Sequence, residues 1–349
     1  MLKYIQEDNS MTDFSTYHEK YMHRCFQLAK AGESYVAPNP MVGAVLVYED
    51  RIIGEGYHQE YGKAHAEVNC LHSVKEADHH LIGKSTLYVS LEPCSHFGKT
   101  PPCTDLIIRH KIPKVVIAVQ DIFSEVNGKG IQRLKENNIE VVTGILEKEG
   151  KELIRQFLYF HSHKMPFVTL KFAQSKDGYI GIKGKEIAIS GILSKRYTHQ
   201  LRAAHQAVLV GKNTVLTDNP QLTLRHWTGK NPVRIVLAHQ DDIPADYNVW
   251  NKEAETLFLS GSIKDVLHSL AEKNIVSVLV EGGADVLRQF MESNSWNEAH
   301  IITSNESIPR TADDIPIASP CIQGIAEKTL YAETDTVQIL KNPDAPFAA

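Results

Sequence analysis

Four residues within a short stretch of the chain have the types and the spacing of a catalytic zinc site. His65 and Glu67 stand in the segment HAEVNC, and Cys94 and Cys103 stand in the segment LEPCSHFGKTPPC. One neutral imidazole and two thiolates give a zinc ion three protein ligands and leave its fourth position to water. An ion held in this way lowers the pKa of its water to about 7. The sequence therefore predicts a centre for zinc-assisted hydrolysis.

Glu67 follows the histidine by two residues, which places it close enough to carry protons while it stays off the metal. One His, two Cys and such a Glu form the signature of zinc deaminases. We expect Glu67 to take a proton from the attacking water, to give it to a ring nitrogen and later to protonate the leaving amine. The amine then departs as ammonia.

Other uses of the same residues stay open at this point. A structural zinc would need a fourth protein ligand, and His96, between the cysteines, is the candidate. A disulfide between Cys94 and Cys103 is disfavoured by the reducing compartment that we expect for this chain, and a chance spacing by the nearby Glu and by the proline before Cys94. Five cysteines at irregular spacing also argue against a disulfide framework, so we expect reduced thiols.

Length and charge restrict the class of protein. A chain of 349 residues exceeds what one hydrophobic core usually serves and favours two domains. A net charge of −5 provides no broad basic field for nucleic acid, so we expect a small-molecule substrate and no nucleic-acid partner. No apolar run has the length of a membrane span, and the N-terminus lacks the apolar core of a signal peptide. We therefore expect a cytoplasmic protein without a membrane partner.

The elements around the zinc residues alternate between helix and strand. Apolar residues recur at helical spacing over 18–31, two apolar runs joined by a polar pair predict a hairpin over 41–58, and a helix is expected to begin at His65. Buried strands follow at 86–93 and 114–120, with a turn or helix between them, and then a helix and a strand within 130–146. This alternation predicts an α/β layer sandwich.

A second α/β domain follows an amphipathic helix over 148–164. We expect the boundary there, with one domain over 1–164 and another over 165–349. No fixed-period repeat and no low-complexity segment interrupts the chain. Strand candidates of the second domain lie at 167–173, 207–211, 233–238, 256–260 and 276–283.

Seven segments in this order resemble the bifunctional riboflavin-biosynthesis deaminase/reductase family: PNPMVGAVLV, GEGYH, HAEV, LEPCSHFGKTPPC, TLKFAQSKDG, VGKNTVLTDNPQLTLR and VEGG. The resemblance covers nearly the whole chain. It implies a cytidine-deaminase-like α/β/α sandwich followed by a dihydrofolate-reductase-like α/β domain, with Zn²⁺ and NADPH as cofactors. It also implies a homo-oligomer that acts on a phosphorylated pyrimidine, a diamino-pyrimidinone ribosylamine phosphate, which is first deaminated and then reduced on its sugar.

In the first domain the resemblance implies zinc ligation by His65, Cys94 and Cys103 and proton transfer by Glu67. It also implies substrate contacts by Asn39, His58, His96 and Lys99. An amide suits a pyrimidine edge and a lysine suits a phosphate. By themselves, Asn39 between two prolines is also a turn former, and Lys99 is also a solvated loop residue.

In the second domain the resemblance implies an active-site lysine at Lys171. Sugar-phosphate contacts are implied for Arg202, Leu222, Arg225 and Glu281, and NADPH contacts for Gln174, Thr214, Asp218 and Gly283. By residue type alone, the arginines are also suited to ion pairs, and Asp218 is also suited to cap a helix. The glycine pair after a buried strand suits a phosphate, but the GxGxxG fingerprint of a Rossmann dehydrogenase is absent.

The chain departs from the family pattern in four places. Ala188 occupies a position where the family usually has a tryptophan, and Ala238 occupies one where it usually has an acidic residue. SIPRTADDIPIASP follows HIITSN in place of the usual segment, and DIFSEVNGKG replaces a DPNP stretch. These departures motivate an alternative, an active deaminase joined to a weak or inactive reductase-like domain that serves binding or assembly. A transfer-RNA or nucleobase deaminase is a third hypothesis and lacks the expected basic surface.

Overall fold

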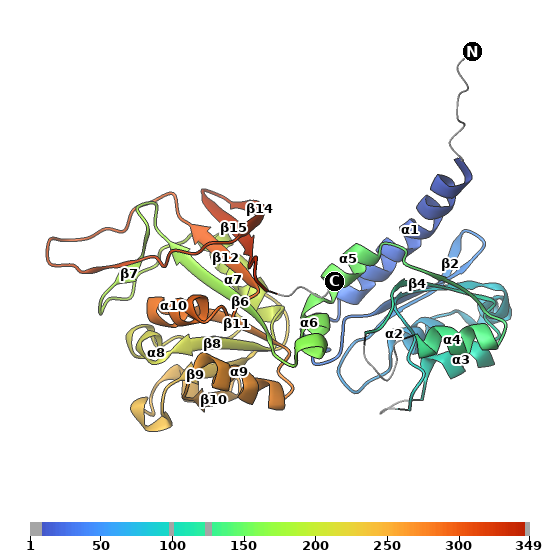
Figure 1. The fold of residues 1–349 in the computed structure, drawn as a ribbon, viewed down its shortest axis with the longest axis horizontal. Coiled ribbons are helices and arrows are strands. Elements are labelled where there is room, and N and C mark those ends of the chain that lie inside the picture. Colours follow the sequence, from blue (N-terminus) through green and yellow to red (C-terminus); the bar gives the residue numbers. More distant parts are fainter. Residues whose placement is uncertain (1–8, 98–100, 123–127, 346–349) are drawn as a thin grey trace, which may run out of the picture. The chain divides into compact units, whose positions relative to one another are not determined.

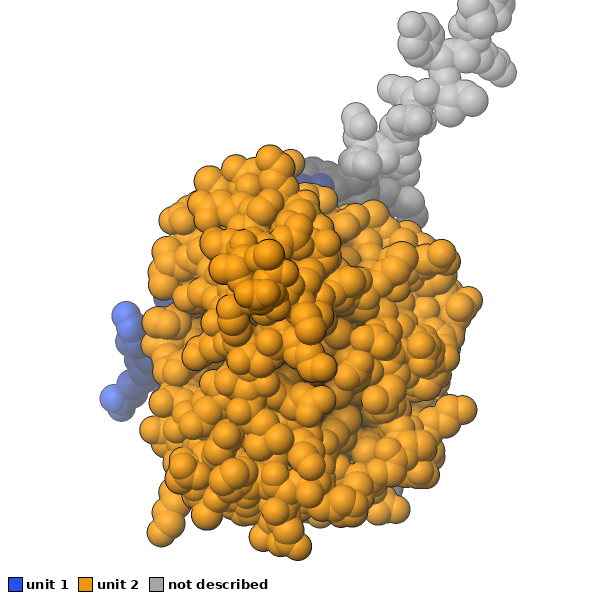
Figure 2. Space-filling model, turned by 90° about the vertical axis from the view of Figure 1, so that its left-hand side faces the viewer, with its two compact units in different colours: residues 1–161 blue, residues 162–349 orange. Residues whose placement is uncertain are grey.

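Helices and strands alternate along both halves of the chain, as the sequence predicts. The computed structural model describes residues 9–97, 101–122 and 128–345. The chain divides into unit 1, residues 1–161, and unit 2, residues 162–349, which Figure 2 colours separately. Within the described ranges, no helix combines the length and the apolar composition that crossing a membrane would require.

Unit 1 is a five-stranded sheet between two layers of helices (Figure 1). Its strand order is β2-β1-β3-β4-β5, antiparallel as far as β3 and parallel beyond it. Apolar residues of α2, α3 and α4 share one core with one face of the sheet, while α1 and α5 lie on the other face. The elements are α1 (Asn9–Lys30), β1 (Gly43–Tyr48), β2 (Arg51–Tyr57), α2 (Ala66–His72), the 3-10 helix η1 (Glu76–Lys84), β3 (Thr86–Leu91), α3 (Cys103–Arg109), β4 (Lys114–Val119), α4 (Lys129–Glu136), β5 (Glu140–Thr143), α5 (Glu147–Leu153) and α6 (Arg155–His163).

The predicted hairpin is confirmed, since β1 and β2 pair antiparallel around a turn at Glu49 and Asp50. Glycines in β2 bring α2 directly onto this hairpin. A Cβ atom at Gly56 would lie 2.2 Å from the backbone nitrogen of Cys70, where no side chain fits. The close approach fixes α2 on the sheet, and His65 precedes this helix at its N-cap.

Two predicted helices differ from those observed. The helix expected over 18–31 begins earlier, at Asn9. The amphipathic helix expected over 148–164 is two helices, α5 and α6, with a local irregularity at Ile154. Hydrogen bonds from Ile154 to Gly150 and from Leu158 to Ile154 continue the helical pattern across the irregularity, so the amphipathic face persists.

Unit 2 has an eight-stranded sheet in the order β10-β9-β8-β11-β6-β12-β15-β14. Neighbours are parallel from β10 to β12 and antiparallel in the last two pairs. α9 and α10 pack on one face of this sheet, and α7 and α8 on the other. The elements are β6 (Phe167–Gln174), β7 (Tyr179–Ile182), α7 (Ile192–Ala203), β8 (Ala207–Gly211), α8 (Lys212–Asp218), β9 (Val233–Leu237), the 3-10 helices η2 (Gln240–Asp242) and η3 (Asn248–Trp250), β10 (Thr256–Leu259), α9 (Ile263–Glu272), β11 (Ser277–Gly282), α10 (Ala284–Glu292), β12 (Glu298–Thr303), β13 (Pro316–Ala318), β14 (Ile325–Ala332) and β15 (Asp335–Lys341).

Sequence reasoning did not identify β7 or the strands from β12 onward. β7 and β13 form a separate two-stranded sheet, which projects from unit 2 in Figure 1. β14 and β15 form a hairpin at one edge of the large sheet. The strands that were predicted from Phe167 to Gly283 are all present and, together with β12, form the parallel part of the sheet.

Candidate active sites

The predicted zinc ligands converge in unit 1. The Nδ1 atom of His65 lies 3.6 Å from the Sγ atom of Cys94 and 3.4 Å from that of Cys103. Tetrahedral zinc with ordinary Zn–N and Zn–S bond lengths places a nitrogen and a sulfur ligand about 3.6 Å apart. All three ligand atoms lie within 4.8 Å of one another. The donor set and its spacing therefore fit one zinc ion.

Each ligand is held by a different part of the fold. His65 is the N-cap residue of α2, Cys103 is the first residue of α3, and Cys94 lies in the loop after β3. The backbone N–H of Cys103 donates to the Cys94 sulfur over 3.3 Å. Hydrogen bonding from the Cys103 side chain, and then from His65, lowers the pKa of Cys94 to about 4. Cys94 is therefore held in the thiolate form in which cysteine binds metal, whereas the same hydrogen bond, and then burial, raises the pKa of Cys103.

The competing uses of these residues find less support. Cys94 and Cys103 are both free thiols, so no disulfide joins them. His96 lies half-buried in the loop after Cys94, and the ligand cluster found among the described residues does not include it. Three protein ligands with an open fourth position is the arrangement of a catalytic zinc site rather than a structural one.

Glu67 lies in the first turn of α2 with its side chain buried, at 3% exposure. Burial raises the pKa of its carboxyl group, and the nearby His65 opposes this shift. Its carboxylate is not part of the ligand cluster. A buried carboxyl group beside the ligands, but off the metal, is the environment that proton transfer requires.

Asn39 and His58 extend the site from the zinc ligands. The His58 ring packs against the His65 ring at 5.5 Å between centroids. Its Nδ1–H donates to the carbonyl of Ala64 over 3.1 Å, so its Nε2 accepts from the Asn39 amide, also over 3.1 Å. Burial lowers the pKa of His58, which keeps the ring in this neutral form. The contact fixes which way the Asn39 amide points.

Two parts of the predicted deaminase site lie outside the described residues. Lys99 is one of them. The other is the central part of the altered stretch DIFSEVNGKG, residues 123–127.

In unit 2, three charged residues meet under α7. Nε and Nη2 of Arg202 donate to the two oxygens of Glu281 over 2.5 and 2.9 Å. Burial alone raises the pKa of Glu281, but the Arg202 charge and hydrogen bonds hold it at about 2. Burial lowers the pKa of Lys171, and the Glu281 charge opposes this shift. A fixed carboxylate thus stands beside a lysine, as active-site proton chemistry requires.

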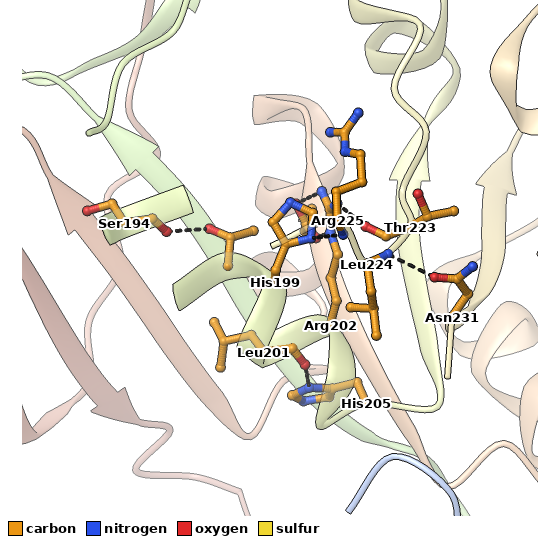
Figure 3. Close-up of polar contacts among 11 residues, drawn as sticks. Ser194, His199, Leu201, Arg202, His205, Thr223, Leu224, Arg225 and Asn231 are labelled. Carbon is orange, nitrogen blue, oxygen red and sulfur yellow. Dashed lines mark hydrogen bonds and ion pairs between the residues drawn. The ribbon is translucent and has the colours of Figure 1, made fainter. Parts of the chain in front are cut away.

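The loop between α8 and β9 brings Thr223 and the backbone of Arg225 to the same side chains of α7 (Figure 3). Nη1 of Arg202 donates to the carbonyl of Thr223 over 3.0 Å. Leu222 is buried with a φ of 56°, and the Arg225 side chain is exposed. Arg202 and Glu281 are thus joined to the loop backbone, while the Arg225 guanidinium group donates to Gln221 over 3.0 Å. Gln174, a predicted NADPH contact at the end of β6, donates to Thr303 over 3.0 Å.

The predicted cofactor residues lie at the carboxyl ends of β8 and β11. A Cβ atom added to Gly283 would lie 3.0 Å from the Thr214 hydroxyl, and one added to Gly282 would lie 3.1 Å from the Cα of Val210. Gly283 also has a φ of 66°, which an L side chain rarely adopts. The chain directly before α10 therefore packs closely against the start of α8 and the end of β8 without side chains of its own. A glycine pair before a helix N-terminus is the arrangement that lets a pyrophosphate approach the backbone.

The remaining predicted cofactor residues lie at the borders of the same edge. Asp218 ends α8 and is exposed. Ala188 lies exposed in the loop between β7 and α7, and Ala238 directly follows β9. These two alanines offer neither an aromatic ring nor a carboxylate to a bound dinucleotide.

Two buried side chains that the sequence analysis did not single out support these sites. Glu92 accepts the backbone N–H groups of Asp121, Gly128 and Ile131 over 3.2, 3.1 and 3.1 Å. His199 accepts the N–H of Arg225 over 3.2 Å. A signal for each is present in the sequence. Glu92 is a carboxylate that ends a buried strand two residues before a zinc ligand, and His199 precedes Arg202 by one helical turn.

Comparison with known proteins supports both halves of this description. Residues 15–119 match the family of the cytidine and deoxycytidylate deaminase zinc-binding region, and residues 166–304 match the RibD C-terminal domain. The riboflavin biosynthesis protein RibD of Bacillus amyloliquefaciens is 40% identical over 360 residues, which cover 95% of each chain. RibD of Aquifex aeolicus is 40% identical over 304 residues, covering 80% of this chain and 84% of that protein.

A solved structure agrees with these relatives. It is the diaminohydroxyphosphoribosylaminopyrimidine deaminase/5-amino-6-(5-phosphoribosylamino)uracil reductase of Thermotoga maritima, which is 33% identical. The match covers 94% of this chain and 99% of that one with a TM-score of 0.86. The predicted fold class is thereby confirmed for both domains. The chain belongs to the RibD family of riboflavin-biosynthesis proteins, with a zinc-binding deaminase domain followed by a reductase domain.

Proposed function

We propose that this chain performs two reactions of riboflavin biosynthesis on one phosphorylated pyrimidine. Unit 1 removes a ring amine by zinc-dependent hydrolysis, and unit 2 then reduces the ribosyl group to ribityl with NADPH. The observation that carries the proposal is the convergence of His65, Cys94 and Cys103 beside a buried Glu67. This convergence occurs in a chain that is 40% identical to a RibD protein over nearly its full length.

The deamination step depends on the position of Glu67. A zinc ion bound by His65, Cys94 and Cys103 supplies the Lewis acid that activates water at neutral pH. Glu67 accepts a proton from the attacking water and passes it to a ring nitrogen, and the water oxygen bonds to the carbon that bears the amine. Glu67 then takes the second proton, from the hydroxyl group now on that carbon, and delivers it to the leaving amine as the carbonyl forms. The carbon–nitrogen bond breaks and ammonia departs.

Substrate binding in unit 1 falls to residues around the zinc ligands. We assign the pyrimidine edge to Asn39, whose amide His58 holds in one orientation. His96 lies in the loop that links two ligands, and we assign it a further substrate contact. Lys99, in the same loop, suits the substrate phosphate as a point charge.

In unit 2 the sugar carbon receives a hydride, which NADPH supplies when it is bound. The carbon–oxygen bond of the ribosyl ring breaks as the new carbon–hydrogen bond forms, and the released oxygen needs a proton. We assign the delivery of this proton to Lys171, beside the Glu281 carboxylate. Arg202, Leu222 and Arg225 surround the sugar phosphate in this assignment.

We assign the dinucleotide pyrophosphate to the glycine pair before α10, where Gly283 lies close to Thr214. Gln174 and Asp218 provide further cofactor contacts in this assignment. Ala188 and Ala238 remove two side chains that the family pattern supplies, so we expect weaker NADPH binding rather than its loss. A cytoplasmic location, a homo-oligomer and the absence of a nucleic-acid partner stay predictions.

Metal analysis joined to assays of both half-reactions on the purified full chain tests this proposal. We expect one zinc ion per chain, ammonia release from the diamino-pyrimidinone phosphate, and NADPH oxidation with the deaminated intermediate. Ammonia release without NADPH oxidation would instead support the alternative in which unit 2 only binds or assembles. Absence of both would contradict the assignment as a whole.

A further inference from the structure

The loop between α8 and β9 obtains its shape from side chains rather than from regular backbone pairing. Arg202 donates to the carbonyl of Thr223 over 3.0 Å. The side-chain oxygen of Asn231 accepts the N–H of Leu224 over 2.8 Å, and His199 accepts the N–H of Arg225 over 3.2 Å. Figure 3 shows these three contacts side by side. The backbone of Thr223, Leu224 and Arg225 is therefore fixed at three consecutive residues. Two of these three contacts come from side chains of α7.

The same loop contains a strained residue. Leu222 has a φ of 56°, which is unfavourable for a residue with a bulky side chain. Its side chain is 2% exposed and packs in an apolar cluster with Val208, Val210 and Val215. Such strain persists only where the surroundings determine the backbone strongly. The contacts from α7, together with this packing, are what determine it here.

His199 is suited to hold this backbone. Its side chain is 4% exposed. Because Nδ1 accepts the Arg225 N–H, the one N–H group of the neutral ring lies at Nε2. Burial, and then the charge of Arg202, lowers the pKa of His199 to about 4. The ring therefore stays an acceptor near neutral pH. The His226 ring packs edge-on against it at 4.9 Å between centroids.

We propose that His199 is a positioning residue of the reductase site, which holds the backbone of Arg225 so that its guanidinium group faces the phosphate of the sugar substrate. The inference rests on the proposed function, because it assigns the exposed Arg225 side chain to that phosphate. His199 itself touches no reacting atom. It acts through one hydrogen bond, from the Arg225 N–H to its own Nδ1.

The matched variants His199→Asn and His199→Gln test the inference in the full-length enzyme. The Asn side chain places an acceptor near the position of Nδ1, whereas the longer Gln side chain places its polar group near that of Nε2. In His199→Gln we expect the KM for 5-amino-6-(5-phosphoribosylamino)uracil to rise about three- to tenfold, the effect of losing one neutral hydrogen bond. The kcat and the KM for NADPH should stay unchanged, and His199→Asn should resemble the wild type.

Thr198→Val is the control, since it removes a neighbouring buried hydroxyl of α7 that donates within the helix, to the carbonyl of Ser194. It should leave all three kinetic constants unchanged. Hydrogen exchange at the Arg225 amide gives a second readout that does not need turnover. Exchange should be fast in His199→Gln and slow in His199→Asn and in the wild type.

A double-mutant cycle decides whether His199 acts through Arg225. In an Arg225→Ala background, His199→Gln should no longer change the KM for the sugar phosphate. Independent, multiplying effects would overturn the inference, and so would faster amide exchange with an unchanged KM. If the wild-type enzyme oxidised no NADPH, the proposed function would be overturned, and this role of His199 with it. The exchange of the Arg225 amide would still report whether the hydrogen bond to His199 exists.

Discussion

Glu67 shows how the environment of a single residue decides its role. Its carboxyl group is buried, at 3% exposure, yet it remains outside the group of atoms that could bind the metal. A carboxylate on the metal would close the open position that water needs. A carboxylate beside it can exchange protons with the water and with the substrate. Position relative to the ligands, rather than residue type, makes Glu67 a proton carrier.

Glu67→Gln keeps the shape of the side chain and removes its ability to carry a proton. We expect ammonia release to fall by at least about 100-fold, the usual contribution of a general acid–base group. The zinc content should stay at the wild-type level, because the three ligands are unchanged. Glu60→Gln, which alters an exposed carboxylate just before the site, is the control. Full deaminase turnover in Glu67→Gln would contradict the assignment.

At the scale of elements, the start of α7 depends on a distant strand. The N-cap residue Gly191 has no side chain to cap the helix. The carboxylate of Asp335, at the first position of β15, accepts the N–H of Gly191 over 2.8 Å and the hydroxyl of Ser194 over 2.7 Å. A negative charge is also favourable at a helix N-terminus. Because α7 carries His199 and Arg202, this cap supports the candidate reductase site.

Asp335→Ala removes the cap and leaves the fully buried Ser194 hydroxyl without its acceptor. We expect a loss of about 2–3 kcal/mol in the free energy of unfolding of unit 2, as for other hydrogen bonds to a buried charged group. For a unit of this size, that loss lowers Tm by about 4–10 °C. Thermal unfolding measures it. Glu333→Gln, in the turn of the same hairpin, should lower Tm by less than about 2 °C, and equal effects of both substitutions would argue against a specific cap.

The whole molecule separates two reactions into two units with cores of their own. Among the described residues, a core of unit 1 joins α2, α3 and α4 to one face of its sheet, and the apolar clusters on the two faces of the unit 2 sheet contain no residue of unit 1. The candidate zinc ligands lie in unit 1, and the glycine pair assigned to the dinucleotide lies in unit 2. Loss of the metal therefore removes binding free energy from unit 1 alone.

Removing zinc with a chelator should abolish ammonia release and leave NADPH oxidation on the deaminated intermediate unchanged. Adding zinc back should restore the deaminase, which excludes irreversible unfolding as the cause of its loss. The two activities are measured on the same sample. A parallel loss of NADPH oxidation would show that the units depend on each other, contrary to this expectation.

Local patterns in the sequence were sufficient for much of the molecule. Alternation of helical and extended periods predicted most elements of unit 1 and all parallel strands of unit 2 except β12, because both depend on side-chain spacing within short segments. The zinc ligands were also predictable, because the metal demands particular residue types. The hairpin of β14 and β15 was not identified. Most residues of β14 are exposed, so few buried apolar side chains mark this segment as a strand.

Tertiary structure alone decided the contacts that hold the sites in place. Asp335 caps a helix that begins 144 residues before it, and His199 meets Arg225 across 26 residues. Neither pair leaves a periodic trace in the sequence, since each contact depends on which strands pair and on which face a helix lies. Chemistry at the metal requires specific residue types and is therefore visible in the sequence. A supporting contact requires only a donor and an acceptor within about 3 Å of each other. Many residue types meet this requirement, and only the fold decides which pairs come that close.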